Sequence, residues 1–149
     1  MCSNIKDFKF INELFGLKKG DEVLVKVGEF FNEYLEDDSI CARIENDRFA
    51  LCMPKEKFNE KAIINRLNEF QKQFDNNAFR MHVFIGVYDI ENLDEPVSIM
   101  CDKANIAGDT IKNDYNSYMA YYNIDKPDIV ELLVKLFRTS AEDRIVKRV

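Results

Sequence analysis

The stretch SICARIENDRFALCMP, residues 39–54, has two short apolar runs on either side of a polar group, ENDR. Each run alternates between apolar and polar residues as a β-strand does, and Asn-Asp is favourable turn chemistry. The pattern therefore predicts a β-hairpin that ends at Pro54, with Arg43 buried on the way into the turn. Two acids and an arginine at the tip leave two interpretations, a plain solvated turn or the remains of a binding site.

Amphipathic helices are predicted on both sides of this hairpin, because apolar residues recur there at three- and four-residue spacing. These helices cover residues 7–14, 18–38, 59–75, 96–112 and 126–149. In the first of them Asp7 is expected to cap the N-terminus, and Gly16 is expected to end it. In the second, Asp21 and Glu22 are expected in the first turn, where the helix dipole favours anions.

The remaining elements complete an α+β domain. The apolar run of residues 79–90 predicts a strand in the centre of a sheet, residues 117–123 predict a last strand, and the opening MCSNI is barely a strand. Helices that alternate with a hairpin and single strands predict a mixed central β-sheet flanked by helices. We expect this domain to cover residues 1–122 and a helical extension or connector to cover residues 123–149.

Composition excludes several classes of function. The 149 residues are 46% hydrophobic and 32% charged, which is typical of one globular domain. The net charge of -6 and the pI near 4.9 argue against a surface for nucleic acid or anionic membranes, but they leave room for one small phosphate pocket. No run of about 18 apolar residues is present, so no membrane span is predicted, and a cytoplasmic location is expected.

The four cysteines are Cys2, Cys41, Cys52 and Cys101, and none of them forms a C-x-x-C pair. Because His82 is the only histidine, ligands for a structural zinc site are missing at standard spacing. Free thiols in a reducing cytosol are expected. The two cysteines on the arms of the hairpin are expected to be reduced and packed, and His82 is expected to be structural.

The motifs around the hairpin resemble those of the GGDEF family. FKFINELFGLKKGDEVLVKV, the hairpin ending RFALCMP, FIGV and DKANIA follow one another as the motifs FKxIND, GHxxGD, the GGDEF hairpin, SIGV and ADxA do in that family. The resemblance covers about residues 4–122. It implies a nucleotidyl-cyclase-like fold that lacks the usual N-terminal helix and most of the first strand. Family members are diguanylate cyclases, which condense two GTP into cyclic di-GMP, or inactive relatives used as regulators.

The family signature Gly-Gly-Asp-Glu-Phe falls on Glu45, Asn46, Asp47, Arg48 and Phe49. Two glycines would let the backbone approach nucleotide phosphates, whereas here the first two letters add bulk and a negative charge. The resemblance makes Asp47 a vestigial metal ligand. It also gives the fourth letter the task of supporting activation of the 3′-hydroxyl. Arg48 cannot perform that task, because a guanidinium stays protonated.

Other site residues of the family are also changed. The first metal aspartate falls on Asn4, a poor ligand for Mg²⁺, and the neighbouring carbonyl ligand would be that of Ile5. The lysine and the arginine that hold the triphosphate fall on Asp109 and Asn113. The phosphate half of the pocket has thus lost two cations and gained acids.

Two residues that read guanine in the family are retained, Asn12 and Asp21, while the RxxD motif of the inhibitory site falls on Glu36 and Ser39. Each retained residue also has a plain interpretation. Asp21 can be a helix cap, Asn12 a solvated helix residue and Asp47 a turn residue. Arg48 is either a surface arginine, or it replaces the charge of a metal ion and itself contacts a phosphate.

Three functions follow from the resemblance. The first is a catalytically inactive regulatory or scaffolding domain of a bacterial cyclic-di-GMP signalling protein, with an EAL or sensor domain in a longer chain, or a second copy, as partner. The second is a GTP-binding module that retains the guanine half-site, and the third is an active cyclase. No cofactor is expected, except Mg²⁺ if GTP binds. Nucleotide binding is expected to be weak and directed to the base, so that guanosine binds no worse than GTP.

Overall fold

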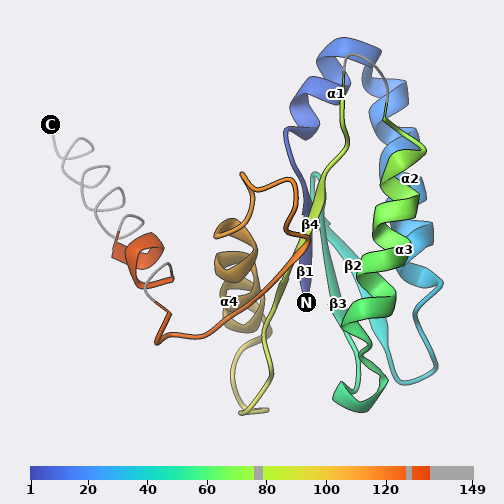
Figure 1. The fold of residues 1–149 in the computed structure, drawn as a ribbon. Helices are drawn as coiled ribbons and strands as arrows, with labels where there is room; N and C mark the ends of the chain where they lie inside the picture. Colours follow the sequence, from blue (N-terminus) through green and yellow to red (C-terminus); the bar gives the residue numbers. More distant parts are fainter. Residues whose placement is uncertain (76–78, 127–128, 135–149) are drawn as a thin grey trace, which may run out of the picture.

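The computed structural model describes residues 1–75, 79–126 and 129–134. Its five-stranded mixed sheet has the order β2-β3-β1-β4-β5, and helices cover both faces, with α2 and α3 on one side and α4 on the other (Figure 1). This arrangement confirms the predicted α+β fold. The strands are β1 (Cys2–Ile5), β2 (Ile40–Glu45), β3 (Arg48–Cys52), β4 (Val83–Val87) and β5 (Met119–Tyr121). The helices are α1 (Phe8–Phe15), α2 (Leu17–Asn32), α3 (Glu60–Lys72), α4 (Val97–Asp109) and a short 3₁₀ turn at Lys55–Lys57.

The opening residues form the middle strand of the sheet, although the sequence barely predicts a strand there. β1 pairs antiparallel with β3 on one side and with β4 on the other. Cys2 lies opposite Ala50 and Gly86, and Ile5 lies opposite Val83. Four residues suffice because hydrogen bonds on both edges and burial on both faces hold the strand.

The predicted hairpin is present, but its first arm is an exposed edge strand, so the expected burial of Arg43 is wrong. Cys41 lies opposite Leu51 and Cys52 lies opposite Ile40, so the two thiols point to opposite faces of the sheet. All four cysteines are free. The expectation that both arm cysteines are packed is also wrong, because Cys52 is exposed and Cys41 is half-buried.

The helix ends differ from the sequence prediction. Asp7 has a left-handed φ of 54° and its side chain makes no cap hydrogen bond. Gly16, at a φ of 85°, ends α1 as expected. α2 begins at Leu17, so Asp21 lies beyond its first turn and is not a cap residue. Most of the predicted last helix, residues 126–149, lies outside the described residues. Its described part includes residues 129–134, which are helical.

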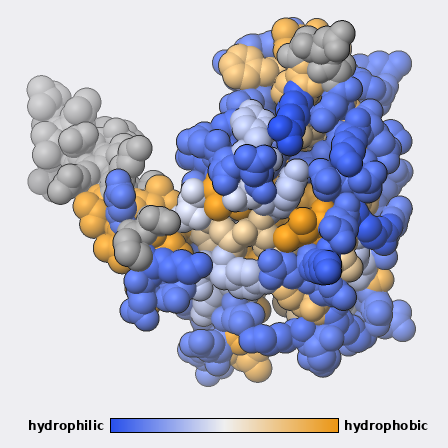
Figure 2. All heavy atoms as spheres, in the orientation of Figure 1, coloured by the Kyte–Doolittle hydropathy of each residue, from blue (hydrophilic) through white to orange (hydrophobic). Residues whose placement is uncertain are grey.

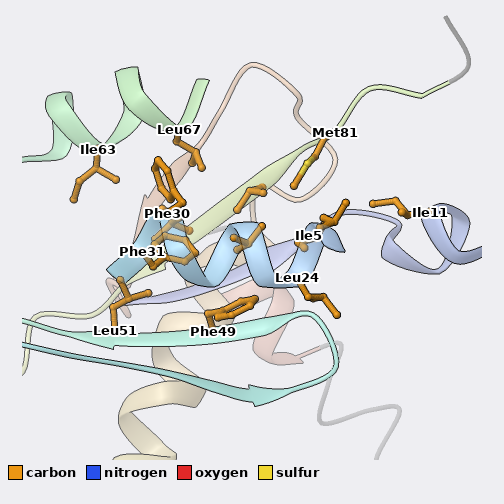
Figure 3. Close-up of a cluster of buried hydrophobic side chains, with 14 of the residues drawn as sticks. Ile5, Ile11, Leu24, Phe30, Phe31, Phe49, Leu51, Ile63, Leu67 and Met81 are labelled. Atoms are coloured by element: carbon orange, nitrogen blue, oxygen red, sulfur yellow. The ribbon is translucent and has the colours of Figure 1, made fainter. Parts of the chain in front are cut away.

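The main core lies between the sheet and the α2–α3 layer (Figure 3). Phe49, the last letter of the hairpin signature, is 4% exposed, and its ring centroid lies 6.0 Å from that of Phe31 on α2. Burial of a phenylalanine side chain contributes about 1.5–3 kcal/mol. The hairpin is thereby anchored to α2. The labelled core residues in Figure 3 are Ile5, Ile11, Leu24, Phe30, Phe31, Phe49, Leu51, Ile63, Leu67 and Met81.

Hydrophilic side chains cover most of the outer surface that Figure 2 shows. Hydrophobic residues gather at the top of this view, where α1 lies, and over residues 129–134 at the left. In these two regions the exposed hydrophobic residues include Phe10, Leu14, Phe15 and Leu17 around α1, and Val130 and Val134 near the end of the described chain.

On the opposite face, α4 approaches β4 so closely that no side chain fits between them. A Cβ atom on Gly86 would lie 1.7 Å from the carbonyl oxygen of Ala104 and 2.6 Å from the amide nitrogen of Gly108. A Cβ atom on Gly108 would lie 3.2 Å from the amide nitrogen of Gly86. Two glycines therefore set the position of the C-terminal end of α4.

Gly86→Ala is expected to destabilise the protein by about 1–3 kcal/mol or more, because the added methyl group must push α4 away from the sheet. The matched control is Gly28→Ala in α2, where the added Cβ meets only Phe49 at an ordinary 3.5 Å. This control should be stabilised by roughly 0.5–1 kcal/mol, since alanine is the better helix former. Urea unfolding measures both. Equal stability of Gly86→Ala and the wild type would contradict the close packing.

His82, just before β4, is buried among three aromatic rings. It is 1% exposed, and its ring centroid lies 4.9 Å from that of Tyr115, 5.7 Å from that of Tyr118 and 6.0 Å from that of Phe84. Burial, together with the positive charges of Arg80 and Lys6, lowers the pKa of His82 to about 4. The imidazole is therefore neutral at pH 7, which fits the structural role expected for it.

Stability should fall as the pH decreases from about 6.5 towards 4. In this window the unfolded chain binds a proton at His82 and the folded chain does not, so acid favours unfolding by about 3 kcal/mol at most. Urea midpoints across this range, compared with those of His82→Gln, isolate the effect from that of the carboxylates. NMR titration of the single histidine gives the pKa directly, and a value of 6 or higher would contradict this expectation.

Candidate functional site

A cavity of about 780 Å³ opens where the end of β1, the hairpin tip, the α1–α2 corner and the end of α4 meet. It brings together most of the site residues that the sequence singled out. These are Asn4, Ile5, Asn12, Asp21, Asn46, Asp47, Arg48, Asp109 and Asn113. Two signature residues do not line it. Phe49 belongs to the core, and Glu45 is exposed, with its carboxylate 3.4 Å from the Arg48 guanidinium.

Asp47, at the hairpin tip, is half-buried and lies close to the end of β1. Burial raises the pKa of the Asp47 carboxyl, while the nearby backbone amides of Asp47 and Ile5 and the charges of Arg48 and Arg43 oppose the increase. Arg43 donates from Nε to the carbonyl oxygen of Asn46 at 2.7 Å, which braces the turn.

Asn46 shows why a glycine suits the second position of the signature. Its φ is 44°, in the left-handed region that glycine enters without strain and asparagine tolerates better than most residues. The turn therefore keeps its backbone shape with a side chain in place. That side chain lines the cavity and occupies space that a glycine would leave open.

α1 and α2 contact each other closely at Asn12 and Gly20, next to Asp21. A Cβ atom on Gly20 would lie 1.9 Å from Oδ1 of Asn12, so the Asn12 side chain lies directly on this glycine. Asp21, the next residue, is exposed and lines the same cavity. An amide and a carboxylate thus line one cavity, and they are the two groups that the family resemblance assigns to the guanine edge.

The metal half-site does not fit a divalent cation. Oδ1 of Asn4 accepts a hydrogen bond from the backbone amide of Ile5 at 2.9 Å, so the amide oxygen is already engaged. Throughout residues 1–75, 79–126 and 129–134, no three acidic, histidine or cysteine side chains cluster where they could hold a metal ion. Asp47 alone is a weak site for Mg²⁺, which prefers several oxygen ligands in near-octahedral geometry.

Four basic side chains in the cavity were missed by the sequence analysis. They are Lys6, Lys9, Arg43 and Lys112. Lys6 and Lys112 were not identified because each lies next to a predicted site position rather than on it. Arg43 was not identified as a cavity residue because it was expected to be buried. The signal for these three residues in the sequence was their position beside Ile5, Asn113 and the hairpin turn, respectively.

A mixed sheet with helices on both faces, and with a polar cavity between the end of its middle strand and a hairpin turn, defines a protein of the nucleotidyl-cyclase-like class. Within this class, residues 1–117 match the sequence model of the family described as "Diguanylate cyclase, GGDEF domain". The chain belongs to the GGDEF family. The family match ends close to β5.

The chain is 25% identical over 100 residues to a diguanylate cyclase of Vibrio cholerae, a match that covers 64% of this chain and 30% of that protein. It therefore spans less than a third of this relative. The structure is similar to the active GGEEF domain of a diguanylate cyclase from Vibrio cholerae, with a TM-score of 0.60, 21% identity and coverage of 82% and 81% of the two chains. An EAL/GGDEF domain protein from M. capsulatus matches with a TM-score of 0.66, 21% identity and coverage of 82% of both chains.

These structural matches establish the fold. In the part of the chain that the structure describes, no helix is both long and apolar enough to cross a membrane.

Proposed function

We propose that this chain is a catalytically inactive GGDEF domain that regulates a cyclic-di-GMP signalling protein. The observation that carries the proposal is Arg48, which lines the cavity where the family signature has an acid. A guanidinium remains protonated at any pH the protein meets, so it cannot support activation of a hydroxyl group. Loss of one acid–base group costs a factor of about 10²–10⁴ in rate.

The rest of the cavity supports the same proposal. A phosphoryl-transfer reaction needs metal ions to neutralise the charge that develops on the phosphate oxygens. Asn4 has no anionic oxygen, and its amide oxygen is bound to the backbone of Ile5. The acid–base group and the anionic metal ligand at the position of Asn4 are thus both missing from one cavity.

A regulatory domain needs an output. The chain covers less than a third of its relative from Vibrio cholerae, and one similar structure belongs to an EAL/GGDEF domain protein. These two findings support an EAL or sensor domain, in the same polypeptide or as a bacterial cytoplasmic partner, as the element that is regulated. A second copy of the chain is the other candidate. On this proposal residues 1–122 are the regulatory domain, and residues 123–149 connect it to the output.

The purified chain should make no cyclic di-GMP from GTP with Mg²⁺ or Mn²⁺, because the ligands for the metals and the hydroxyl-activating acid are absent. Chromatography with mass detection measures the product, and an active family member serves as the positive control. Boiled protein gives the background. Product that accumulates above this background would refute the proposed function.

A second function, a guanine-nucleotide-binding module, is favoured by the contact between Asn12 and Gly20. This contact holds the amide beside Asp21 at the edge of the cavity. A site that pairs with the polar edge of a base rejects analogues that lack this edge. Such a module would regulate its partner through occupancy of the cavity and would need no catalysis.

Guanosine should bind with a dissociation constant around millimolar, roughly -4 kcal/mol, and adenosine should not bind detectably. Gly20→Ala should abolish guanosine binding, because the added Cβ would lie where Oδ1 of Asn12 now lies. Gly28→Ala, also in α2, is the matched control and should bind as the wild type does. Ligand-observed NMR measures all three proteins. Equal binding of guanosine and adenosine would leave Asn12 and Asp21 without a role in recognition.

A further inference from the structure

The cavity, which does not fit a divalent cation, is lined by more basic than acidic side chains. Five basic side chains line the cavity, against four acidic ones. The basic residues are Lys6, Lys9, Arg43, Arg48 and Lys112, and the acidic residues are Asp7, Asp21, Asp47 and Asp109. In a chain with a net charge of -6, a slight excess of positive charge around one cavity is unusual. It indicates an anionic ligand.

Lys6 is the best positioned of these cations. It follows the end of β1 directly, and its backbone amide donates to the carbonyl oxygen of His82 at 2.8 Å, which fixes its Cα. Its Nζ donates to Oδ1 of Asn113 at 2.7 Å and lies 5.2 Å from the ring centroid of Tyr115. The side chain is only 16% exposed. The ammonium group of a cavity-lining lysine is thus held in place two residues from Asn4.

The carboxylate nearest to Lys6 does not neutralise it. Asp7 lies 4.0 Å from Nζ, at the limit of an ion pair, and its own side chain is 48% exposed. The hydrogen bond to Asn113 is made to a neutral amide, which leaves the positive charge in place. At least one N–H of the ammonium group therefore remains able to donate to a ligand.

Lys112 supplies the second cation. It lies beside Asn113, the residue that holds Lys6, and it makes no hydrogen bond or ion pair within the described parts of the chain. Asp109, at the end of α4, lines the same cavity. Two lysines that line one cavity, each with N–H groups left to donate, suit a multiply charged anion.

We propose that Lys6 and Lys112 bind the phosphate chain of a nucleoside oligophosphate directly, without a divalent cation. This inference rests on the proposed function only in that the base belongs to the same ligand. Ammonium groups form short, charge-assisted hydrogen bonds to phosphate oxygens and replace the charge that a metal ion would bring. Mg²⁺ should therefore not be needed. It should weaken binding, because it occupies the oxygens that the lysines contact.

The expectation drawn from the sequence changes accordingly. Guanosine was expected to bind no worse than GTP, because the phosphate half had lost its aligned cations. Lys6 and Lys112, each next to a position that the family uses, supply positive charge to the phosphate half of the cavity. The triphosphate should therefore bind more tightly than the nucleoside alone.

The test is isothermal titration calorimetry on the full chain, with GTP, guanosine and inorganic tripolyphosphate, in EDTA and in excess Mg²⁺. In EDTA, GTP should bind at least about tenfold more tightly than guanosine, and tripolyphosphate should also bind. The double variant Lys6→Gln/Lys112→Gln should lose this advantage for GTP and retain guanosine binding. Lys112→Gln alone should lose part of the advantage of GTP over guanosine. This variant is expected to fold normally, because Lys112 makes no hydrogen bond or ion pair in the described part of the chain. Lys72→Gln on α3 is the matched charge control and should bind as the wild type does.

Three results would overturn the inference. They are GTP binding that requires Mg²⁺, GTP affinity no greater than that of guanosine in EDTA, and an unchanged GTP affinity in the double variant. None of these outcomes depends on catalysis. Formation of cyclic di-GMP would refute the proposed inactivity and leave binding without metal standing, whereas Mg²⁺-dependent binding without product would do the reverse.

Discussion

The backbone ladders of β1 hold the two halves of the sheet together. Cys2 lies between Ala50 of the hairpin and Gly86 of β4, so within the described sheet β1 is the strand that joins the hairpin to β4 and β5. The strand ends at Ile5, whose amide donates to Oδ1 of Asn4 at 2.9 Å, and the hairpin tip lies close by at Asp47. Every wall of the cavity is therefore positioned relative to one short strand. The walls that α4 contributes also depend on the contact between Gly86 and Gly108.

The sequence predicts the larger elements well because their signals are long. The apolar stripe of α2 and the alternation around the hairpin extend over many residues, and burial enforces both patterns. β1 is missed because four residues contain too little pattern to identify a strand, and tertiary pairing alone establishes it. Arg43 is misplaced because alternation predicts which residues share a face, whereas burial also depends on whether anything covers that face. β2 is an edge strand, and the described part of the chain leaves it exposed.

The candidate site divides in the same way. Residue positions taken from the family resemblance lead to one cavity, because the fold fixes the backbone at Asn4, Asn12, Asp47 and Asn113. The electrostatics are not predictable from those positions alone. A lysine side chain is long, so a cation can enter a cavity from a neighbouring position, as Lys6 and Lys112 do. A residue-by-residue comparison counts such a change as a loss, although the charge in the cavity is kept.

The signature letters that this chain shares with the family both have structural tasks that need no ligand. Phe49 fills the core beneath the hairpin, and the half-buried carboxylate of Asp47 is stabilised by nearby backbone amides at the turn and at the end of β1. The letters that differ, Glu45, Asn46 and Arg48, are exposed or line the cavity, where substitution costs little folding free energy. The presence of Asp47 is therefore no evidence for a bound metal, since its carboxylate has a partner in the backbone. The frame of the cavity thus depends on Phe49 and the backbone around Asp47, and the letters that differ can change without loss of this frame.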